Sequence, residues 1–285
     1  MAIEVKHVSF TYSPKTPNAY EALKDVSTCI NDGDYLTIVG QTGSGKSTLV
    51  QMLNGLTMPT SGAIFVDEQD TKIWCKKTKT TRLLRKKVGL VFQFPEYQLF
   101  EETILKDVAF GLINYGMKKE QAYEKAKEYI LKVGLNESYF TKSPFELSGG
   151  EKRKVAIAGI LALEPEILIL DEPTAGLDPK SKEDLLNLIT QLHDEGKTIA
   201  LVTHNMSIVR KYANHVILIE KGKAFFDGTP DEFFVNDEVC KIIEVPEVIE
   251  FARKLKVKGI DIDVNKATSV DSLVEQIKLW RAKDE

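Results

Sequence analysis

The sequence predicts an α/β fold with a mainly parallel core sheet. Short apolar runs typical of buried strands alternate with longer segments of helical periodicity, and this alternation favours parallel strands joined by helices. The strand-length runs are apolar throughout, as strands covered on both faces usually are. The chain has 285 residues, of which 43% are hydrophobic and 28% charged. It can therefore bury a sizeable core in one large domain or two modest ones.

The N-terminal region predicts two strands, a glycine-rich loop and a helix. Residues 3–10 alternate apolar and polar side chains, which indicates a half-exposed strand, and a second strand pattern covers 21–30. The run 35–39 is a candidate buried strand that leads directly into the glycine-rich loop. A helix is expected from about Gly45 to Gly55, where a glycine can end it.

Residues 63–91 combine short strand patterns with a basic stretch over 76–87. We interpret this stretch as a solvated face, because Leu83, Leu84 and Val88 supply a buried side between the charges. A nucleic-acid or membrane patch is the alternative.

Helical and strand patterns alternate along the rest of the chain. In order, they predict helices over 104–116 and 118–134, a helix after Gly150, a strand over 167–172, a helix over 179–195, a strand over 198–204, a helix over 206–213 and a hairpin over 216–228. Two further helical segments, 245–256 and 269–283, lie near the C-terminus. We expect residues 1–230 to form the main domain and 231–285 a small, mainly helical C-terminal extension.

Composition excludes several classes of protein. The net charge of −4 argues against nucleic acid as the main partner, because phosphate-binding proteins usually carry a basic excess. No apolar run approaches the ~18 residues of a membrane-spanning helix, and the N-terminus lacks a secretory signal pattern. Cys29, Cys75 and Cys240 are an odd count without C-x-x-C spacing, so we expect a reducing compartment and no structural zinc.

A phosphate-binding loop is predicted between the strand at 35–39 and the following helix. Residues 40–47 fit the pattern G-x-x-x-x-G-K-[ST] in the strand–loop–helix context that this pattern requires. Its glycines let backbone N–H groups face phosphate oxygens, and the helix N-terminus adds positive potential. The residues expected to bind ATP here are Gly40, Gln41, Thr42, Gly43, Ser44, Gly45, Lys46, Ser47 and Thr48.

The apolar strand at 167–172 ends in two carboxylates, Asp171 and Glu172. Beside a nucleotide, Asp171 can hold Mg²⁺ and Glu172 can orient and polarise the attacking water. A buried strand with an exposed acidic tip is the alternative.

Four further segments bear on the class of nucleotide enzyme. Residues 147–153, LSGGEKR, form a second glycine-rich helix start and hence a second candidate anion site, although Ser148 and Glu151 can equally form a capping box. Gln93 follows a strand pattern, TAGLD at 174–178 follows the two carboxylates, and His204 ends the next strand.

In this order, GQTGSGKST, LSGGE and ILILDEPTAGLD resemble the ATP-binding cassette (ABC) family over roughly residues 3–230. The resemblance implies a P-loop cassette with an N-terminal antiparallel β subdomain and an inserted helical subdomain at about 95–165. It also implies that two cassettes pair head to tail around two ATP molecules, with the C-terminal extension as a dimer contact. The chain is thus expected to be an ATP hydrolase.

The same resemblance assigns roles to individual residues. It implies that Glu172, His204 and Gln93 are catalytic and that Mg²⁺ is held by Ser47, Gln93 and Asp171. Tyr12 takes the position of the aromatic residue that stacks on adenine. The residues expected to act at the dimer interface are Ser148, Gly149, Gly150 and Glu151, which serve the partner's ATP, and Asp178 at the seam.

The segment Phe94–Thr103, FPEYQLFEET, is similar to the ATPases of energy-coupling factor (ECF) transporters, in particular the second of two related types. This similarity implies a peripheral subunit on the cytoplasmic face of the membrane that powers vitamin or micronutrient uptake. Its partners would be a second ATPase subunit, a membrane coupling protein docked on this segment and a substrate-binding membrane protein.

Three alternatives remain: an ATPase for cobalt or nickel uptake, another ABC importer, or a cassette that acts on DNA or ribosomes without transport. The single cassette and the absence of a basic excess disfavour the last. At the docking segment we expect the apolar Phe94, Leu99 and Phe100, with acids such as Glu96 among them, to meet a basic partner helix.

Overall fold

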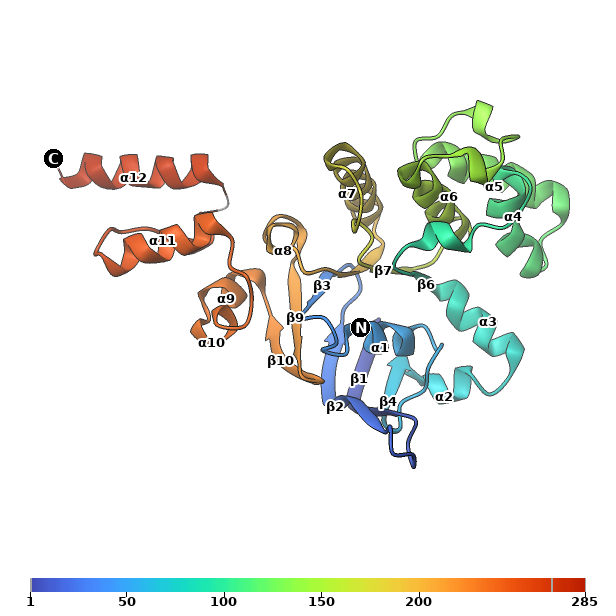
Figure 1. Ribbon diagram of the computed structural model, residues 1–285, viewed down its shortest axis with the longest axis horizontal. Helices are drawn as coiled ribbons and strands as arrows, with labels where there is room; N and C mark the ends of the chain where they lie inside the picture. The colour runs from blue at the N-terminus through green and yellow to red at the C-terminus, as the bar shows by residue number, and fades with distance from the viewer. Residues whose placement is uncertain (1, 268, 285) are drawn as a thin grey trace.

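The computed structural model describes residues 2–267 and 269–284, arranged around two sheets (Figure 1). The larger has six strands in the order β10-β9-β3-β8-β7-β6, and all neighbours are parallel except the β9–β10 hairpin. These strands are β3 (Tyr35–Val39), β6 (Val88–Val91), β7 (Ile167–Asp171), β8 (Thr198–Val202), β9 (His215–Glu220) and β10 (Lys223–Gly228). The predicted α/β class with a mainly parallel core sheet is confirmed.

The smaller sheet is antiparallel and lies at the N-terminal side, as expected for an N-terminal β subdomain. Its order is β2-β1-β4-β5, formed by β1 (Ile3–Tyr12), β2 (Tyr20–Ile30), β4 (Ser61–Val66) and β5 (Gln69–Asp70). The first two strands begin or end within two residues of the predicted ones, because their alternating pattern marks one buried face.

Two groups of helices lie at opposite ends of the molecule (Figure 1). The green group at one end contains α4, α5 and α6, whereas α9 to α12 form the orange and red group at the other end. The helices are α1 (Lys46–Leu53), α2 (Thr71–Trp74), α3 (Thr78–Lys87), α4 (Ile104–Asn114), α5 (Lys119–Lys132), α6 (Gly149–Leu161), α7 (Pro179–Asp194), α8 (Met206–Tyr212), α9 (Pro230–Val235), α10 (Asp237–Cys240), α11 (Glu247–Val257) and α12 (Val270–Asp284). Short 3₁₀ turns are η1 (Pro95–Gln98), η2 (Glu137–Tyr139), η3 (Pro144–Glu146) and η4 (Val264–Lys266). Within 2–267 and 269–284, no helix combines the length and apolarity needed to cross a bilayer.

The central sheet separates two hydrophobic clusters. In β7, Leu168 and Leu170 pack with the α4–α6 group, whereas Ile167 and Ile169 pack with α1 and the antiparallel sheet. Successive side chains of a strand point to opposite faces, so one apolar strand supplies both cores. A third cluster joins β9 to the C-terminal helices α9 and α11.

The prediction for the basic stretch was wrong at one residue. Leu84 and Val88 are fully buried as expected, but Leu83 is 49% exposed. Consecutive residues of an α-helix point about 100° apart, and α3 turns Leu84 towards the core and Leu83 towards solvent.

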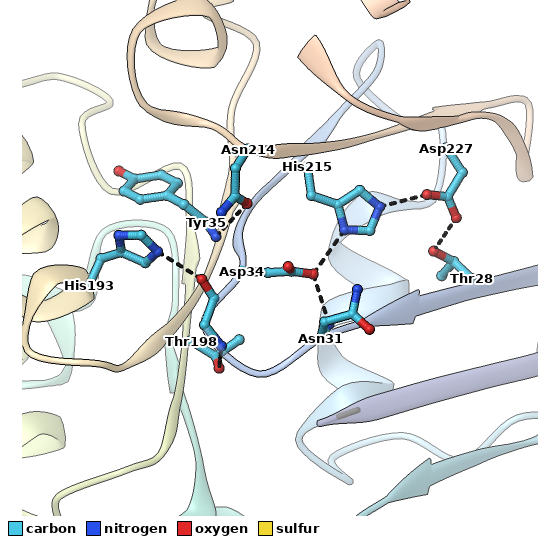
Figure 2. Close-up of polar contacts among 10 residues, drawn as sticks. Thr28, Asn31, Asp34, Tyr35, His193, Thr198, Asn214, His215 and Asp227 are labelled. Atoms are coloured by element: carbon cyan, nitrogen blue, oxygen red, sulfur yellow. Dashed lines mark hydrogen bonds and ion pairs between the residues drawn. The ribbon is translucent and has the colours of Figure 1, made fainter.

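A polar network ties the two sheets together (Figure 2). The ring of His215, at the start of β9, lies between two carboxylates: Nδ1 is 3.1 Å from Asp34 Oδ2 and Nε2 is 2.6 Å from Asp227 Oδ1. The hydroxyl of Thr28 in β2 donates to the other oxygen of Asp227. These two hydrogen bonds to carboxylates raise the pKa of His215 to about 9, so the ring carries its proton at neutral pH.

Candidate active site

The loop between β3 and α1 has backbone angles that only glycine adopts easily. Gly40 has φ +145° and Gly45 has φ +111°. A Cβ atom would lie 2.2 Å from the carbonyl oxygen of Ile219 at Gly40 and 2.6 Å from that of Ala22 at Gly45. Glycine at both positions therefore lets the loop curl tightly ahead of the α1 N-terminus, where unpaired N–H groups and the helix dipole favour an anion.

Lys46 points back into this loop. Its ammonium nitrogen donates to the carbonyl oxygens of Gly40 and Gln41, each at 2.8 Å. Burial lowers the pKa of Lys46, and the nearby Glu172 and Asp171 act in the opposite direction. Two of its three N–H donors are used by the loop, so one remains for a ligand oxygen.

Two side chains of the loop and α1 complete the polar lining. The hydroxyl of Ser44 is buried without a hydrogen-bond partner in the described chain, which suits an oxygen of a bound ligand. The hydroxyl of Ser47 hydrogen-bonds Asp171 at the end of β7. Burial raises the pKa of Asp171, and the Ser47 hydrogen bond and Lys46 oppose that rise.

Three polar side chains meet where three neighbouring parallel strands end. Gln93 follows β6, Glu172 follows β7 and His204 follows β8. Gln93 Nε2 donates to Glu172 Oε2 at 3.2 Å, and His204 Nδ1 lies 3.5 Å from Glu172 Oε1. The carboxylate therefore has one contact on each oxygen, and the exposed His204 leaves the group open to solvent.

The backbone of Glu172 is unusual in a way that the sequence did not reveal. Its φ of +46° lies in the left-handed region, which costs a residue with a Cβ about 1–2 kcal/mol. Its N–H donates to the carbonyl oxygen of Val202 at 3.1 Å, and this bond to β8 fixes the conformation. Nine other non-glycine residues of the described chain also have a positive φ, so it is the place of Glu172 at the end of β7 that singles it out.

Two tyrosines stand beside the loop. Tyr12, at the end of β1, is 41% exposed, packs edge-on against Phe10 and shares a hydrogen bond of 3.0 Å with the Thr48 hydroxyl. Tyr20, which the sequence analysis missed, donates from its hydroxyl to the carbonyl oxygen of Gly43 at 3.1 Å. An exposed aromatic residue at the start of β2 carries no pattern that would have marked it.

The LSGGE segment begins α6 with a complete capping box, so that interpretation of its local structure is confirmed. The Ser148 hydroxyl accepts from the N–H of Glu151, and Glu151 Oε2 accepts from the N–H of Ser148 at 2.9 Å and from its hydroxyl at 2.7 Å. The Tyr139 hydroxyl donates to Glu151 Oε1, which lowers the pKa of Glu151 and further fixes the carboxylate. Asp178 caps α7 in a similar way by accepting from the N–H of Ser181.

The α6 start does not line the hollow beside the phosphate loop. Ser148, Gly149 and Gly150 lie with Asp178 in a hollow of about 450 Å³. A separate hollow of about 330 Å³ is lined by loop residues 41–44, and the two have no lining residue in common. The α6 start and loop residues 41–44 therefore line different hollows of the chain.

The docking segment differs from its prediction at two residues. Glu96 forms an ion pair with Arg153, and its side chain is only 13% exposed, so it does not face a partner. Leu99 belongs to the core. Among its aromatic residues, Tyr97 and Phe100 are the most exposed, at 85% and 56%, and Phe94 is 38% exposed.

The ABC transporter family model matches residues 23–175, more than half of the chain. The chain therefore belongs to the ABC transporter family, and it is an ATP-hydrolysing transport ATPase. Within the family it groups with the ATP-binding proteins of energy-coupling factor transporters. It is 49% identical over 280 residues to energy-coupling factor transporter ATP-binding protein EcfA2 of Streptococcus agalactiae serotype Ia, covering 98% of this chain and 99% of the relative. The EcfA2 protein of Enterococcus faecalis is 49% identical over 282 residues, covering 97% and 96%.

Solved structures show the same fold. The structure of cbiO1 from Clostridium perfringens, described as part of the ABC transporter complex cbiONQ, matches with a TM-score of 0.73 and 33% identity over 90% of this chain and 95% of its own. A dimeric post-hydrolysis state of the ATP-binding cassette MJ0796, bound to ADP and Pi, matches with a TM-score of 0.72 and 32% identity over 80% of this chain and 98% of its own.

Proposed function

We propose that ATP binds at residues 40–48 and that Glu172 polarises the water that attacks the γ-phosphate. The observation that carries this proposal is the convergence of Gln93, Glu172 and His204 beside the loop that holds Lys46. Parallel strands end at one edge of a sheet, and ligands of such folds bind at that edge. In this arrangement Tyr12 offers its exposed ring to the adenine base.

Mg²⁺ fits the oxygen donors beside this site. A hydroxyl and a carboxylate, Ser47 and Asp171, are already in contact there, and Gln93 adds an amide oxygen. Magnesium prefers a small number of such oxygens together with phosphates and water. When bound, it would neutralise charge on the phosphate oxygens.

The side chains around the site have separate roles in binding and hydrolysis. Lys46 directs its remaining N–H donor at the phosphates, and the orphaned Ser44 hydroxyl adds a second donor. Glu172 takes the water proton, while Gln93 fixes one oxygen of its carboxylate. His204 is exposed enough to turn towards the γ-phosphate.

We infer that the active form is a head-to-tail pair of cassettes. Because the α6 start and the phosphate loop lie in separate hollows, Ser148, Gly149, Gly150 and Glu151 serve the partner's ATP, with Asp178 at the seam. Residues 1–230 form the nucleotide-binding domain, with a helical subdomain at about 95–165, and 231–285 add a dimer contact. The partner cassette is a paralogue or a second copy.

The membrane partners follow from the relatives' names, which describe transporter subunits. We infer that a membrane coupling protein docks on Phe94–Thr103 and that a separate membrane protein binds the substrate. The chain would then lie peripherally at the cytoplasmic face and drive uptake of a vitamin or other micronutrient. Cobalt or nickel ions are the second candidate cargo.

The variant Glu172→Gln tests the catalytic assignment in the assembled complex. It keeps the shape of the side chain and loses the charge that polarises water, so kcat for ATP should fall at least about 100-fold while ATP still binds. Glu120→Gln, which changes an exposed residue of α5, is the matched control and should be unaffected. Hydrolysis by Glu172→Gln at the wild-type rate would remove Glu172 from the mechanism.

A further inference from the structure

Arg153 in α6 is a buried arginine with four hydrogen bonds to two other segments. Its side chain is 3% exposed. Nε and Nη2 donate to the two carboxylate oxygens of Glu96, at 3.1 and 2.7 Å. Nη1 donates to the carbonyl oxygens of Pro173 and Ala175, at 2.8 and 2.7 Å.

These contacts join the three segments that the proposed function uses. Glu96 lies three residues after Gln93 and inside the docking segment. Pro173 and Ala175 belong to the loop that leaves Glu172 and reaches the proposed dimer seam. Arg153 itself lies one turn beyond the α6 start, and the hollow that holds this helix start is lined by all three segments.

We propose that Arg153 is a positioning residue, paired with Glu96, that couples the membrane-protein docking segment to both ATP sites of the cassette pair. The inference rests on the proposed function and deepens it. A displacement of η1 moves Arg153, because Glu96 in η1 is hydrogen-bonded to it. Arg153 in turn displaces the loop after Glu172, to which it donates two hydrogen bonds. It also displaces the start of α6, the proposed site for the partner's ATP, because Arg153 belongs to that helix.

The chemistry of the contacts requires arginine. A planar guanidinium presents a fork of donors that matches a carboxylate on one side and still reaches two carbonyl oxygens on the other. Lysine carries the same charge at one point and cannot hold both sets of acceptors in fixed directions. The centroid of the Phe94 ring lies 5.7 Å from the guanidinium carbon, so an aromatic ring also packs against this group.

The alternative is that this buried ion pair only stabilises the fold. In that case a variant of Arg153 would lower the stability of the chain without a selective effect on ATP turnover. The contacts here argue against it, because two of the four acceptors are carbonyl oxygens of a loop beside Glu172, outside any strand or helix. By holding that loop in place, Arg153 also helps to hold Glu172 in position.

The test is Arg153→Lys in the assembled membrane complex, which leaves no unpaired charge beside Glu96. The matched control is Arg210→Lys, since Arg210 also donates to a carboxylate, that of Asp231, and its side chain is only 10% exposed, but it lies in α8, which the proposed function does not use. For each variant, kcat, KM and the Hill coefficient for MgATP hydrolysis are measured. Hydrogen exchange of the amides in 93–99 and 173–178 is followed in parallel, together with the melting temperature.

We expect Arg153→Lys to lower kcat by about ten- to 100-fold, because small misplacements of catalytic groups cost that much, with KM within about twofold of wild type. Its Hill coefficient should fall towards one, and both peptide segments should exchange at least about tenfold faster. Arg210→Lys should change none of these.

Wild-type kcat and exchange in Arg153→Lys would overturn the proposal, and so would equal losses in both variants. Failure of the proposed function is recognised separately, by wild-type hydrolysis in Glu172→Gln. The exchange measurement does not depend on hydrolysis, so it still decides whether Arg153 fixes the two segments.

Discussion

Gln93 and Glu172 are joined by a hydrogen bond of 3.2 Å across the ends of two neighbouring parallel strands, β6 and β7. The two residues lie 79 positions apart in the chain, and only the parallel pairing of the strands brings them together. The contact links the residue that directly precedes the docking segment to the carboxylate proposed to polarise water.

The first prediction concerns this hydrogen bond. Gln93→Ala frees one oxygen of Glu172 and removes the amide oxygen proposed for Mg²⁺, so kcat for ATP should fall about tenfold or more. Gln98→Ala, in η1 of the same segment, is the matched control and should retain wild-type turnover. Steady-state hydrolysis measures both, and equal turnover in the two variants would disprove the role of Gln93.

The second prediction tests whether the α6 start acts on the chain's own ATP or on the partner's ATP. Ser148→Arg blocks the α6 start with a large side chain, but that start lies outside the hollow of the phosphate loop. ATP affinity of the separate chain should stay within about twofold, whereas ATP-dependent pairing in a Glu172→Gln background should be lost. Equilibrium dialysis and size-exclusion chromatography measure the two quantities, with Ser138→Arg as the control. A large loss of ATP affinity would contradict the assignment to the partner's site.

The third prediction concerns the corrected docking surface. Tyr97 and Phe100 are the exposed aromatic residues of η1 and the residues after it, so Tyr97→Ala with Phe100→Ala removes the contact area offered to a membrane protein. We expect unfolding free energy to change by less than about 1 kcal/mol, because most of this surface is already solvated. ATP binding should persist while copurification with the membrane subunits fails. Phe225→Ala, 47% exposed in β10, is the matched control.

The fourth prediction follows from the network around His215. Its pKa is about 9 in the folded chain and near 6.5 in the unfolded one. The folded state therefore holds the proton more tightly, and this stabilisation is complete below about pH 6.5 and is lost as pH rises through about 9. It amounts to roughly 3 kcal/mol of unfolding free energy.

Urea unfolding between pH 6 and 10 measures this dependence. In His215→Gln the slope over that window should flatten, whereas Thr28→Val, which leaves both carboxylates beside the ring, should keep it. An unchanged slope in His215→Gln would show that the network does not hold the proton.

Much of the site was predictable because it depends on strand order. Gln93, Asp171, Glu172 and His204 each end an apolar strand pattern, and parallel strands bring such ends to one edge. The phosphate loop was predictable because its glycines and Lys46 stand at fixed spacing.

The remainder depends on contacts that no local pattern records. Glu96 has charge and apolar neighbours, which favour a solvent-facing position, and only Arg153, 57 residues away, makes its burial possible. The left-handed φ of Glu172 depends on the hydrogen bond to β8. His215 similarly acquires its two carboxylate partners only when the sheets meet.

The capping box at Ser148 has a thermodynamic consequence. The Ser148 hydroxyl can donate to one acceptor at a time, and in the separate chain that acceptor is Glu151. In the cassette pair proposed above, a phosphate oxygen of the partner's nucleotide would displace this carboxylate, so the gain would be the difference between two charge-assisted hydrogen bonds, each worth about 1.5–3 kcal/mol. An exchange of nearly equal bonds is close to isoenergetic and readily reversed. The hydroxyl can therefore return to Glu151 once the phosphate leaves, and the helix start is reset for another round without an external input of energy.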